Sequence, residues 1–183
     1  MRKLRIKLIV IIGLFMMISG VASAAVSSSD APPPLSHDAY LRLDGIAGDS
    51  KARHYENWIV LSGVQFEVSN NAKAANGGGS GSGRAAVDSF TVTKNLDAAS
   101  TPLLQAALSG TNIKSGQFVL TTRGEAPSTV LTIDLNAVNV TGYEFNNEQE
   151  TIRLTFNAMK FSYSPSDPKG NKSSPVSASW NSK

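Results

Sequence analysis

Residues 129–143 read TVLTIDLNAVNVTGY, and this stretch decides the fold class. Apolar side chains alternate from Leu131 to Ala137, which is the period of a β-strand, and the apolar set then changes phase at Val138. A one-residue slip sends every later side chain to the opposite face, so the strand needs a β-bulge or a change of sheet. Residues 151–163, TIRLTFNAMKFSY, change phase in the same way after Ala158. Long strands that bend in this way suit a barrel or a corner-turning sandwich.

Four shorter stretches alternate with the same period: DAYLRLDG, VQFEVS, SFTVTK and QFVLTTR. Their apolar positions are expected on the inner face of the sheet, and Arg42, Gln65 and Glu67 are expected to face solvent. The sequence therefore predicts a mainly β fold, a small antiparallel β-barrel of two packed sheets. The expected inner positions are Ala39, Leu41, Leu43, Val64, Phe66, Val68, Phe90, Val92, Phe118 and Leu120, with Leu154 and Phe156 from the last long strand.

One short helix interrupts the strands, within TVTKNLDAASTPLLQAALSG at residues 91–110. Ser100 or Thr101 is the expected N-cap, Pro102 suits the first turn, and Gly110 suits a left-handed exit. A helix of about nine residues is unstable alone, so one face must dock on the barrel. That face is expected to contain Leu104, Ala107 and Leu108.

The N-terminus has the order of a secretory signal peptide: a basic end, an apolar run from Leu8 to Ile18, and small residues at Ala22 and Ala24. Cleavage after Ala24 removes four of the 17 basic residues and leaves 13 against 14 acidic residues, a net charge of −1 in place of +3. The alternative, a membrane anchor, needs about 20 apolar residues, whereas this run is interrupted by Ser19 and Gly20.

The pI of 9.2 does not indicate a nucleic-acid partner, because the excess of basic residues is lost with the signal peptide.

Composition gives the domain organisation: a signal peptide at 1–24, a disordered linker at 25–36, a barrel domain at 37–165 and a disordered tail at 166–183. Absence of cysteine excludes thiol chemistry and a lipid-modified cysteine anchor. After cleavage we expect a secreted protein, extracellular or periplasmic, without stable membrane insertion.

No arrangement of residues indicates catalysis, a cofactor or a metal. His37 lies beside Asp38 and His54 lies two residues before Glu56, but a metal site usually needs three or four ligands, and these scattered pairs do not supply them. Glu144, Glu148 and Glu150 fit a polar hairpin turn better than an acid–base pair. The glycine-rich loop at 70–84 lacks the ending of a phosphate-binding loop and is expected to be a mobile arm for self-association. Its contact residues are Asn76, Gly77, Gly78, Gly79, Ser80, Gly81, Ser82 and Gly83.

Two segments carry a resemblance to a known family. LRLDGIAGDS near the start and FTVTKNLDAASTPLLQAALSG in the middle, followed by a strand ending in YSP, resemble the haemolysin-coregulated protein (Hcp) family, the tube subunit of type VI secretion systems. The likeness runs from Asp38 to Pro165. It implies a small antiparallel β-barrel flanked by one helix, hexameric rings that stack into a hollow tube, and no catalytic residues.

Two functions follow as alternatives. The first is a non-enzymatic secreted structural protein that assembles with itself into hexameric rings, with secretion spike, sheath or effector proteins as further candidate partners. Tube subunits of the family are expelled by a contractile machine, whereas a signal peptide implies export of the chain on its own. The second is an exported monomeric β-barrel module that binds carbohydrate or protein, for which Tyr40, Tyr55 and Trp58 are the candidate aromatic residues.

Overall fold

Nine antiparallel strands and one helix lie within the residues that the computed structural model describes, which are 35–70, 85–124, 126–165 and 173–182. These ranges belong to one compact unit, Pro32–Lys183. The expected signal peptide and nearly all of the expected linker lie outside the described residues. The elements are β1 (Asp38–Leu43), β2 (Ile59–Leu61), β3 (Gly63–Asn70), β4 (Ala85–Asn95), α1 (Ser100–Ser109), β5 (Ile113–Thr121), β6 (Thr129–Asn146), β7 (Gln149–Thr155), β8 (Ala158–Tyr163) and β9 (Val176–Asn181).

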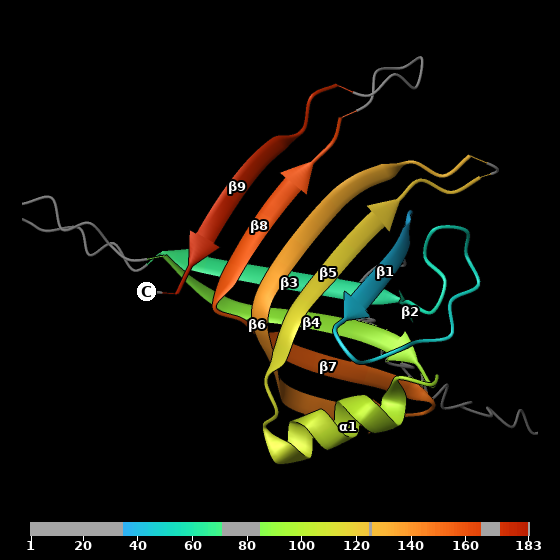
Figure 1. The fold of residues 1–183 in the computed structure, drawn as a ribbon, viewed down its shortest axis with the longest axis vertical. Helices are drawn as coiled ribbons and strands as arrows, with labels where there is room; N and C mark the ends of the chain where they lie inside the picture. Colours follow the sequence, from blue (N-terminus) through green and yellow to red (C-terminus); the bar gives the residue numbers. More distant parts are fainter. Residues whose placement is uncertain (1–34, 71–84, 125, 166–172, 183) are drawn as a thin grey trace, which may run out of the picture. The chain divides into compact units, whose positions relative to one another are not determined.

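Strand β6 connects two layers of this unit (Figure 1). The first half of β6 lies between β5 and β8, and the order β2–β1–β5–β6–β8–β9 makes the first layer. The second half pairs with β7, which continues to β4 and β3 in the second layer. The mainly β, antiparallel fold with one short helix is thus confirmed.

The phase change predicted in β6 is a change of sheet at Ala137. Ala137 has a φ of +52°, and β6 pairs with β8 up to Asn136 and with β7 from Asn139 onward. Val138 is fully buried beyond the bend. The second predicted phase change is a break rather than a bend, because β7 ends at Thr155 in one layer and β8 begins at Ala158 in the other.

A closed barrel is not confirmed. The hydrogen-bonded path ends at β2 on one side and β3 on the other, and no ladder pairs these two strands with each other in the described part of the chain. They are consecutive along the chain through Ser62, whose N–H donates to the carbonyl of Thr93 at 2.8 Å. The two layers are therefore joined at this corner by the chain and a single backbone bond.

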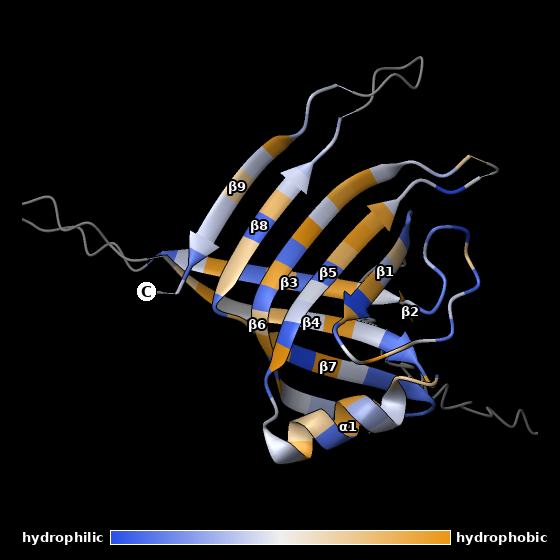
Figure 2. Cartoon of the chain, in the orientation of Figure 1, coloured by the Kyte–Doolittle hydropathy of each residue, from blue (hydrophilic) through white to orange (hydrophobic). Residues whose placement is uncertain are grey.

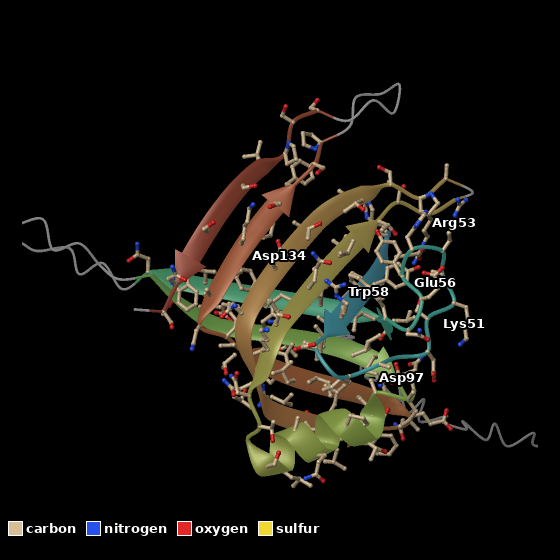
Figure 3. All side chains as sticks on the ribbon, in the orientation of Figure 1. Lys51, Arg53, Glu56, Trp58, Asp97 and Asp134 are labelled. Atoms are coloured by element: carbon tan, nitrogen blue, oxygen red, sulfur yellow. The ribbon has the colours of Figure 1, made fainter. Side chains whose placement is uncertain are left out.

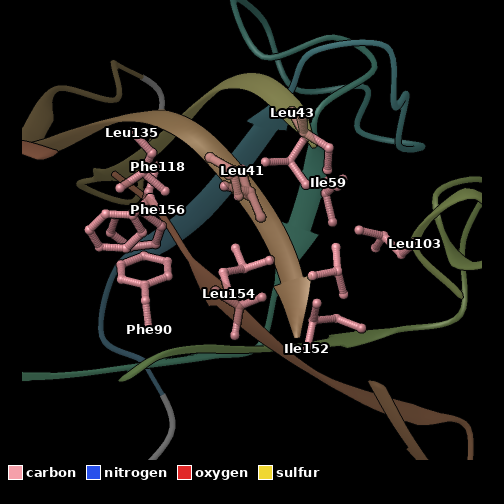
Figure 4. Close-up of a cluster of buried hydrophobic side chains, with 14 of the residues drawn as sticks. Leu41, Leu43, Ile59, Phe90, Leu103, Phe118, Leu135, Ile152, Leu154 and Phe156 are labelled. Carbon is pink, nitrogen blue, oxygen red and sulfur yellow. The ribbon is translucent and has the colours of Figure 1, made fainter. Parts of the chain in front are cut away.

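The core lies between the layers and is built around Phe90 (Figure 4). Phe90 packs edge-to-face against Phe66, Phe118 and Phe156, with ring centroids 5.8, 5.9 and 6.1 Å apart. Such pairs add about 0.5–1.5 kcal/mol each beyond the area they bury. Apolar segments recur along β5, β6 and β7 in Figure 2, whereas β9 is mostly pale. Leu154 and Phe156 lie inside as predicted, and Arg42, Gln65 and Glu67 are exposed as predicted.

One expected inner position is wrong. Val68 is 51% exposed, because the β3–β4 register shifts between Glu67 and Val68 and turns the side chain outward. Tyr40 alternates with the inner residues Ala39 and Leu41 along β1, and it is nevertheless buried, beneath a stacked tyrosine, Tyr55.

Helix α1 ends as predicted but begins and docks differently. Gly110 has a φ of +65°, and its N–H donates to the carbonyl of Ala106 at 2.9 Å. The N-cap is Ala99, which makes no side-chain cap, so the predicted cap at Ser100 or Thr101 is wrong. Ser100 points into the protein instead, and residues three and six positions later, Leu103 and Ala106, share its buried face.

The expected docking face of α1 is therefore wrong by about one position. Leu104 is 40% exposed and Leu108 is 75% exposed, while Ala107 is only partly buried. The inward contacts of Ser100 fix the rotation of the helix. Ser100 is polar, so a prediction from the apolar residues alone does not include it.

The expected disordered tail needs a correction at Val176–Asn181, which form β9 on the edge of β8. Trp180 explains this strand. Its side chain packs against the core and lies edge-to-face with Phe156 at 6.0 Å. One large aromatic residue thus anchors a segment whose other residues do not pack against the core. Residues 166–172 and 183 lie outside the described residues.

Candidate functional site

A cluster of buried polar side chains lies where α1 begins against the second layer. Lys94 of β4 and Glu150 of β7 are direct cross-strand partners, both are fully buried, and they form an ion pair. The Lys94 amine also lies 3.0 Å from Ser100 Oγ and 2.8 Å from Asp97 Oδ1. With Tyr143 of β6, these residues make the Lys94 cluster: Lys94, Asp97, Ser100, Tyr143 and Glu150.

The Glu150 carboxylate is the centre of the Lys94 cluster. Ser100 Oγ donates to Glu150 Oε2 at 2.9 Å, and the Tyr143 hydroxyl donates to Oε1. Burial alone would raise the pKa of Glu150, but the hydrogen bonds from Lys94, Tyr143 and Ser100 outweigh it and hold the pKa below its usual range. Burial and the bond to Glu150 raise the pKa of Tyr143 to about 12. The cluster therefore keeps a charged carboxylate and a neutral phenol.

The contact between Lys94 and Ser100 has the composition of a serine–lysine catalytic pair, but its geometry favours structure. An ammonium group has three donors and no acceptor, and three oxygen atoms occupy the donors of Lys94. Ser100 Oγ in turn accepts from the N–H of Asp97 at 3.0 Å and donates to Glu150. Every polar atom of the pair is thus engaged, and the cluster joins β4, β6, β7 and α1.

Sequence reasoning missed this cluster. Glu150 was assigned to a polar hairpin turn, but the turn is at Asn147 and Glu148, which have φ values of +48° and +66°. Simple alternation contained the signal, because Lys94 follows Phe90 and Val92 on the inner face. Glu150 likewise precedes Ile152 and Leu154 on the inner face of β7.

The residues predicted for self-association, 76–83, lie outside the described residues, so that hypothesis stays a prediction. His37 contacts the hydroxyl of Ser36 at 2.9 Å, and His54 is exposed at the tip of the β1–β2 loop. Within the described ranges, no group of three or more histidine, aspartate or glutamate side chains could hold a metal ion. Glu144 and Glu148 are both exposed and do not join Glu150 in a site.

Besides Val68 and Phe145, six large apolar side chains are exposed in the described part of the chain, and they fall into three pairs. Tyr163 and Val176 are cross-strand partners on β8 and β9, with exposures of 45% and 68%, and we call them the β8–β9 patch. Leu104 and Leu108 lie one turn apart on the outer face of α1. Val60 and Leu96 line one shallow hollow beside Asp97.

Three strand edges also lack partners. Among the described strands, β9 pairs only with β8, β3 pairs only with β4 and β2 pairs only with β1. Unpaired strand edges and exposed apolar side chains are the features that favour association with another chain.

Comparison with known proteins gives a family match. A family model described as type VI secretion system effector, Hcp, matches residues 40–163, well over half of the chain. The chain belongs to the Hcp family. The Hcp match spans all strands from β1 to β8, together with α1 and the Lys94 cluster. No curated protein matches the chain.

Solved structures agree with the Hcp fold. A structure of a type six secretion system protein is 24% identical with a TM-score of 0.74, covering 80% of this chain and 96% of that chain. A type VI secretion system effector from Yersinia pestis is 28% identical with a TM-score of 0.63, covering 79% and 99%. Hcp1 from Salmonella typhimurium is 21% identical with a TM-score of 0.60, covering 80% and 95%.

Membership of the Hcp family, with this fold, supports a structural protein of type VI secretion that associates with copies of itself. The Hcp family is a family of tube proteins rather than enzymes. The one described helix, α1, is too short to cross a membrane.

Proposed function

We propose that the processed chain is an exported, non-enzymatic tube subunit that assembles into hexameric rings, and that these rings stack into a tube. The observation that carries this proposal is coverage: the family match includes residues 40–163, and the similar solved chains are covered over 96% and 99% of their length. The domain therefore matches such chains over nearly their whole length, which supports a subunit of the same type.

The exposed features of the domain support a head-to-tail ring. Such a ring needs two different surfaces on each subunit, and it closes when the rotation between neighbours allows it. The β8–β9 patch with the unpaired edge of β9 is one candidate surface. The unpaired edge of β3, next to the 76–83 loop in the sequence, is a second. Spike, sheath or effector proteins are further candidate partners, as the family implies.

The proposal includes export after cleavage of the first 24 residues. A basic N-terminal end, an apolar run and small residues before Ala25 favour this step. The expected product begins at Ala25 and is found outside the cytoplasmic membrane. N-terminal sequencing of the exported protein tests this, and recovery of the full-length chain from the cytoplasm alone would contradict it.

Light scattering tests the ring. We expect the processed wild-type protein to have several times the monomer mass, and a deletion of residues 76–83 to lower that mass while the far-ultraviolet circular dichroism stays unchanged. A wild-type protein that stays monomeric at high concentration contradicts the ring and favours the alternative, a monomeric binding module. A deletion variant that assembles like the wild type removes the loop from the interface but not the ring.

A further inference from the structure

The loop between β1 and β2 is held in a defined shape. Three backbone bonds join its two arms: Gly48 N–H to Asn57 O at 2.8 Å, Asn57 N–H to Ser50 O at 2.9 Å, and Ser50 N–H to Trp58 O at 3.0 Å. Asn57 and His54 have φ values of +61° and +74°, which non-glycine residues adopt infrequently. Strained residues of this kind persist where the surrounding structure determines them, and they gather at functional sites.

The loop brings its two aromatic residues, Tyr55 and Trp58, to Tyr40 of β1. Tyr55 stacks on Tyr40 with ring centroids 4.6 Å apart and an interplanar angle of 3°, and it meets Trp58 edge-to-face at 5.2 Å. The Tyr55 hydroxyl is 3.0 Å from Thr129 Oγ1, and the Arg42 guanidinium lies 5.1 Å from the centre of the Trp58 ring. This aromatic column fixes the position of Trp58.

A hollow of about 290 Å³ lies beside Trp58. The loop supplies Trp58 and Glu56, both labelled in Figure 3, together with Asn57, and β1 supplies Arg42. Leu43 and Ile46 add apolar surface. Glu56, Asn57 and Arg42 are exposed, and Trp58 is half-buried. The volume is just below the range for ligand pockets, about 300–1,000 Å³, so the hollow suits one or two small rings.

We propose that this hollow binds a neutral saccharide. A sugar ring has an apolar face of C–H groups and a rim of hydroxyl groups. Trp58 and the Arg42 guanidinium that lies over its ring offer a flat surface for the apolar face of the sugar. Glu56 and Asn57 offer planar polar groups, which together accept from and donate to neighbouring hydroxyls. The proposal goes beyond the ring and does not depend on it.

Charge and polarity favour a neutral saccharide over two other ligand classes. A phosphate-bearing ligand needs several cations, and the hollow has one guanidinium opposed by the carboxylate of Glu56. A wholly apolar ligand would leave the polar atoms of Glu56, Asn57 and Arg42 without water or partners, which costs free energy. A hydroxyl-rich ring satisfies these groups and covers Trp58.

The test is titration of the purified full chain with maltotriose, cellotriose and chitotriose, followed by tryptophan fluorescence and calorimetry. We expect saturable binding of at least one trisaccharide in the millimolar range or tighter, and a change in the emission of Trp58. The Trp180→Phe variant removes the second tryptophan, which packs on the other side of the fold against Phe156, and should keep the signal.

Matched variants locate the site. Trp58→Ala, Glu56→Gln and Asn57→Gly should each weaken binding by about tenfold or more. Asn57→Gly is a sharp probe, because glycine adopts the positive φ of this position and only the amide is lost. Glu67→Gln, which changes an exposed carboxylate of β3 outside the hollow, should leave binding within about twofold.

Three results overturn the proposal: no trisaccharide binds the folded wild type, inorganic phosphate binds this hollow while the sugars do not, or the sugars bind equally well to Trp58→Ala and Asn57→Gly. Each of these outcomes leaves the ring untouched, because ring formation is measured as mass without any sugar.

Discussion

The Lys94 cluster and the β8–β9 patch depart from the usual distribution of side chains in opposite ways. In the cluster, charged groups are inside the protein; in the patch, Tyr163 and Val176 are outside it. The polar atoms of the cluster find all their partners within one chain, and the described residues include no buried side-chain nitrogen or oxygen without a hydrogen bond. The patch has no such partner over its exposed surface. The first feature therefore serves the fold, and the second is suited to another molecule.

The largest expected effect comes from breaking the cluster. Glu150→Ala leaves the buried Lys94 amine without its main partner, and loss of one member of a buried ion pair costs about 3–5 kcal/mol. Urea unfolding measures this loss. The matched control is Lys94→Met with Glu150→Leu, which removes both charges and should recover most of the stability. A double variant as unstable as Glu150→Ala would show that the cluster contributes more than charge balance.

The next effect sharpens the role of Tyr143. Tyr143→Phe removes one hydrogen bond to the Glu150 carboxylate, and a bond to a charged group contributes about 1.5–3 kcal/mol. A retained wild-type stability in Tyr143→Phe would contradict the place of Tyr143 in the cluster.

The pH dependence of stability has a defined sign for both groups. The pKa of Tyr143 is about 12 in the folded protein and about 10 unfolded, so its contribution is complete below about pH 10 and is lost as the pH rises towards 12. The pKa of Glu150 is lowered on folding, so its contribution is present above about pH 4.3 and is lost as the pH falls below that value. Unfolding free energies measured across pH should show a smaller alkaline loss in Tyr143→Phe than in the wild type; part of the loss remains, because burial also raises the pKa of Tyr40.

A smaller effect is expected at the end of α1. No atom lies within 4 Å of a side chain added at Gly110, so Gly110→Ala tests only the left-handed backbone with its φ of +65°. We expect a loss of about 1 kcal/mol in unfolding free energy. An unchanged stability would mean that the helix end adopts another conformation at little cost.

How far the sequence predicts this molecule depends on whether a contact is local. The change of sheet at Ala137 follows from the phase of the apolar residues around it, because every strand residue must face one side or the other. The cap at Gly110 is equally local. The predicted docking face of α1 was wrong, because the rotation of the helix depends on the contact between Ser100 and Glu150, which are 50 residues apart in the sequence.

The same limit applies to the sites. Lys94 and Glu150 occupy inner positions by alternation. Charged side chains are rarely buried unless they are paired, so alternation alone does not place them inside before the partner strand is known. Strand β9 depends on Trp180 reaching Phe156, which composition does not indicate. The aromatic residues near β1 were identified as candidates, whereas their stacking depends on the course of the β1–β2 loop.

The smallest effect on stability, and the largest on assembly, is expected at the β8–β9 patch. Replacing exposed side chains usually changes stability by no more than about 0.5 kcal/mol, so Tyr163→Ser with Val176→Ser should unfold almost like the wild type. Leu104→Ser with Leu108→Ser is the matched control, since it also removes two exposed apolar side chains, on α1. We expect the α1 control to keep its assembly.

Sedimentation velocity of the processed wild type beside the Tyr163→Ser, Val176→Ser variant tests the central claim most directly. The account predicts a single assembled species for the wild type, with the mass of a closed ring, and a folded monomer for the variant. A wild type that sediments as a monomer at every concentration, or a variant that assembles as the wild type does, would contradict the assignment of the fold to the cluster and of assembly to the patch.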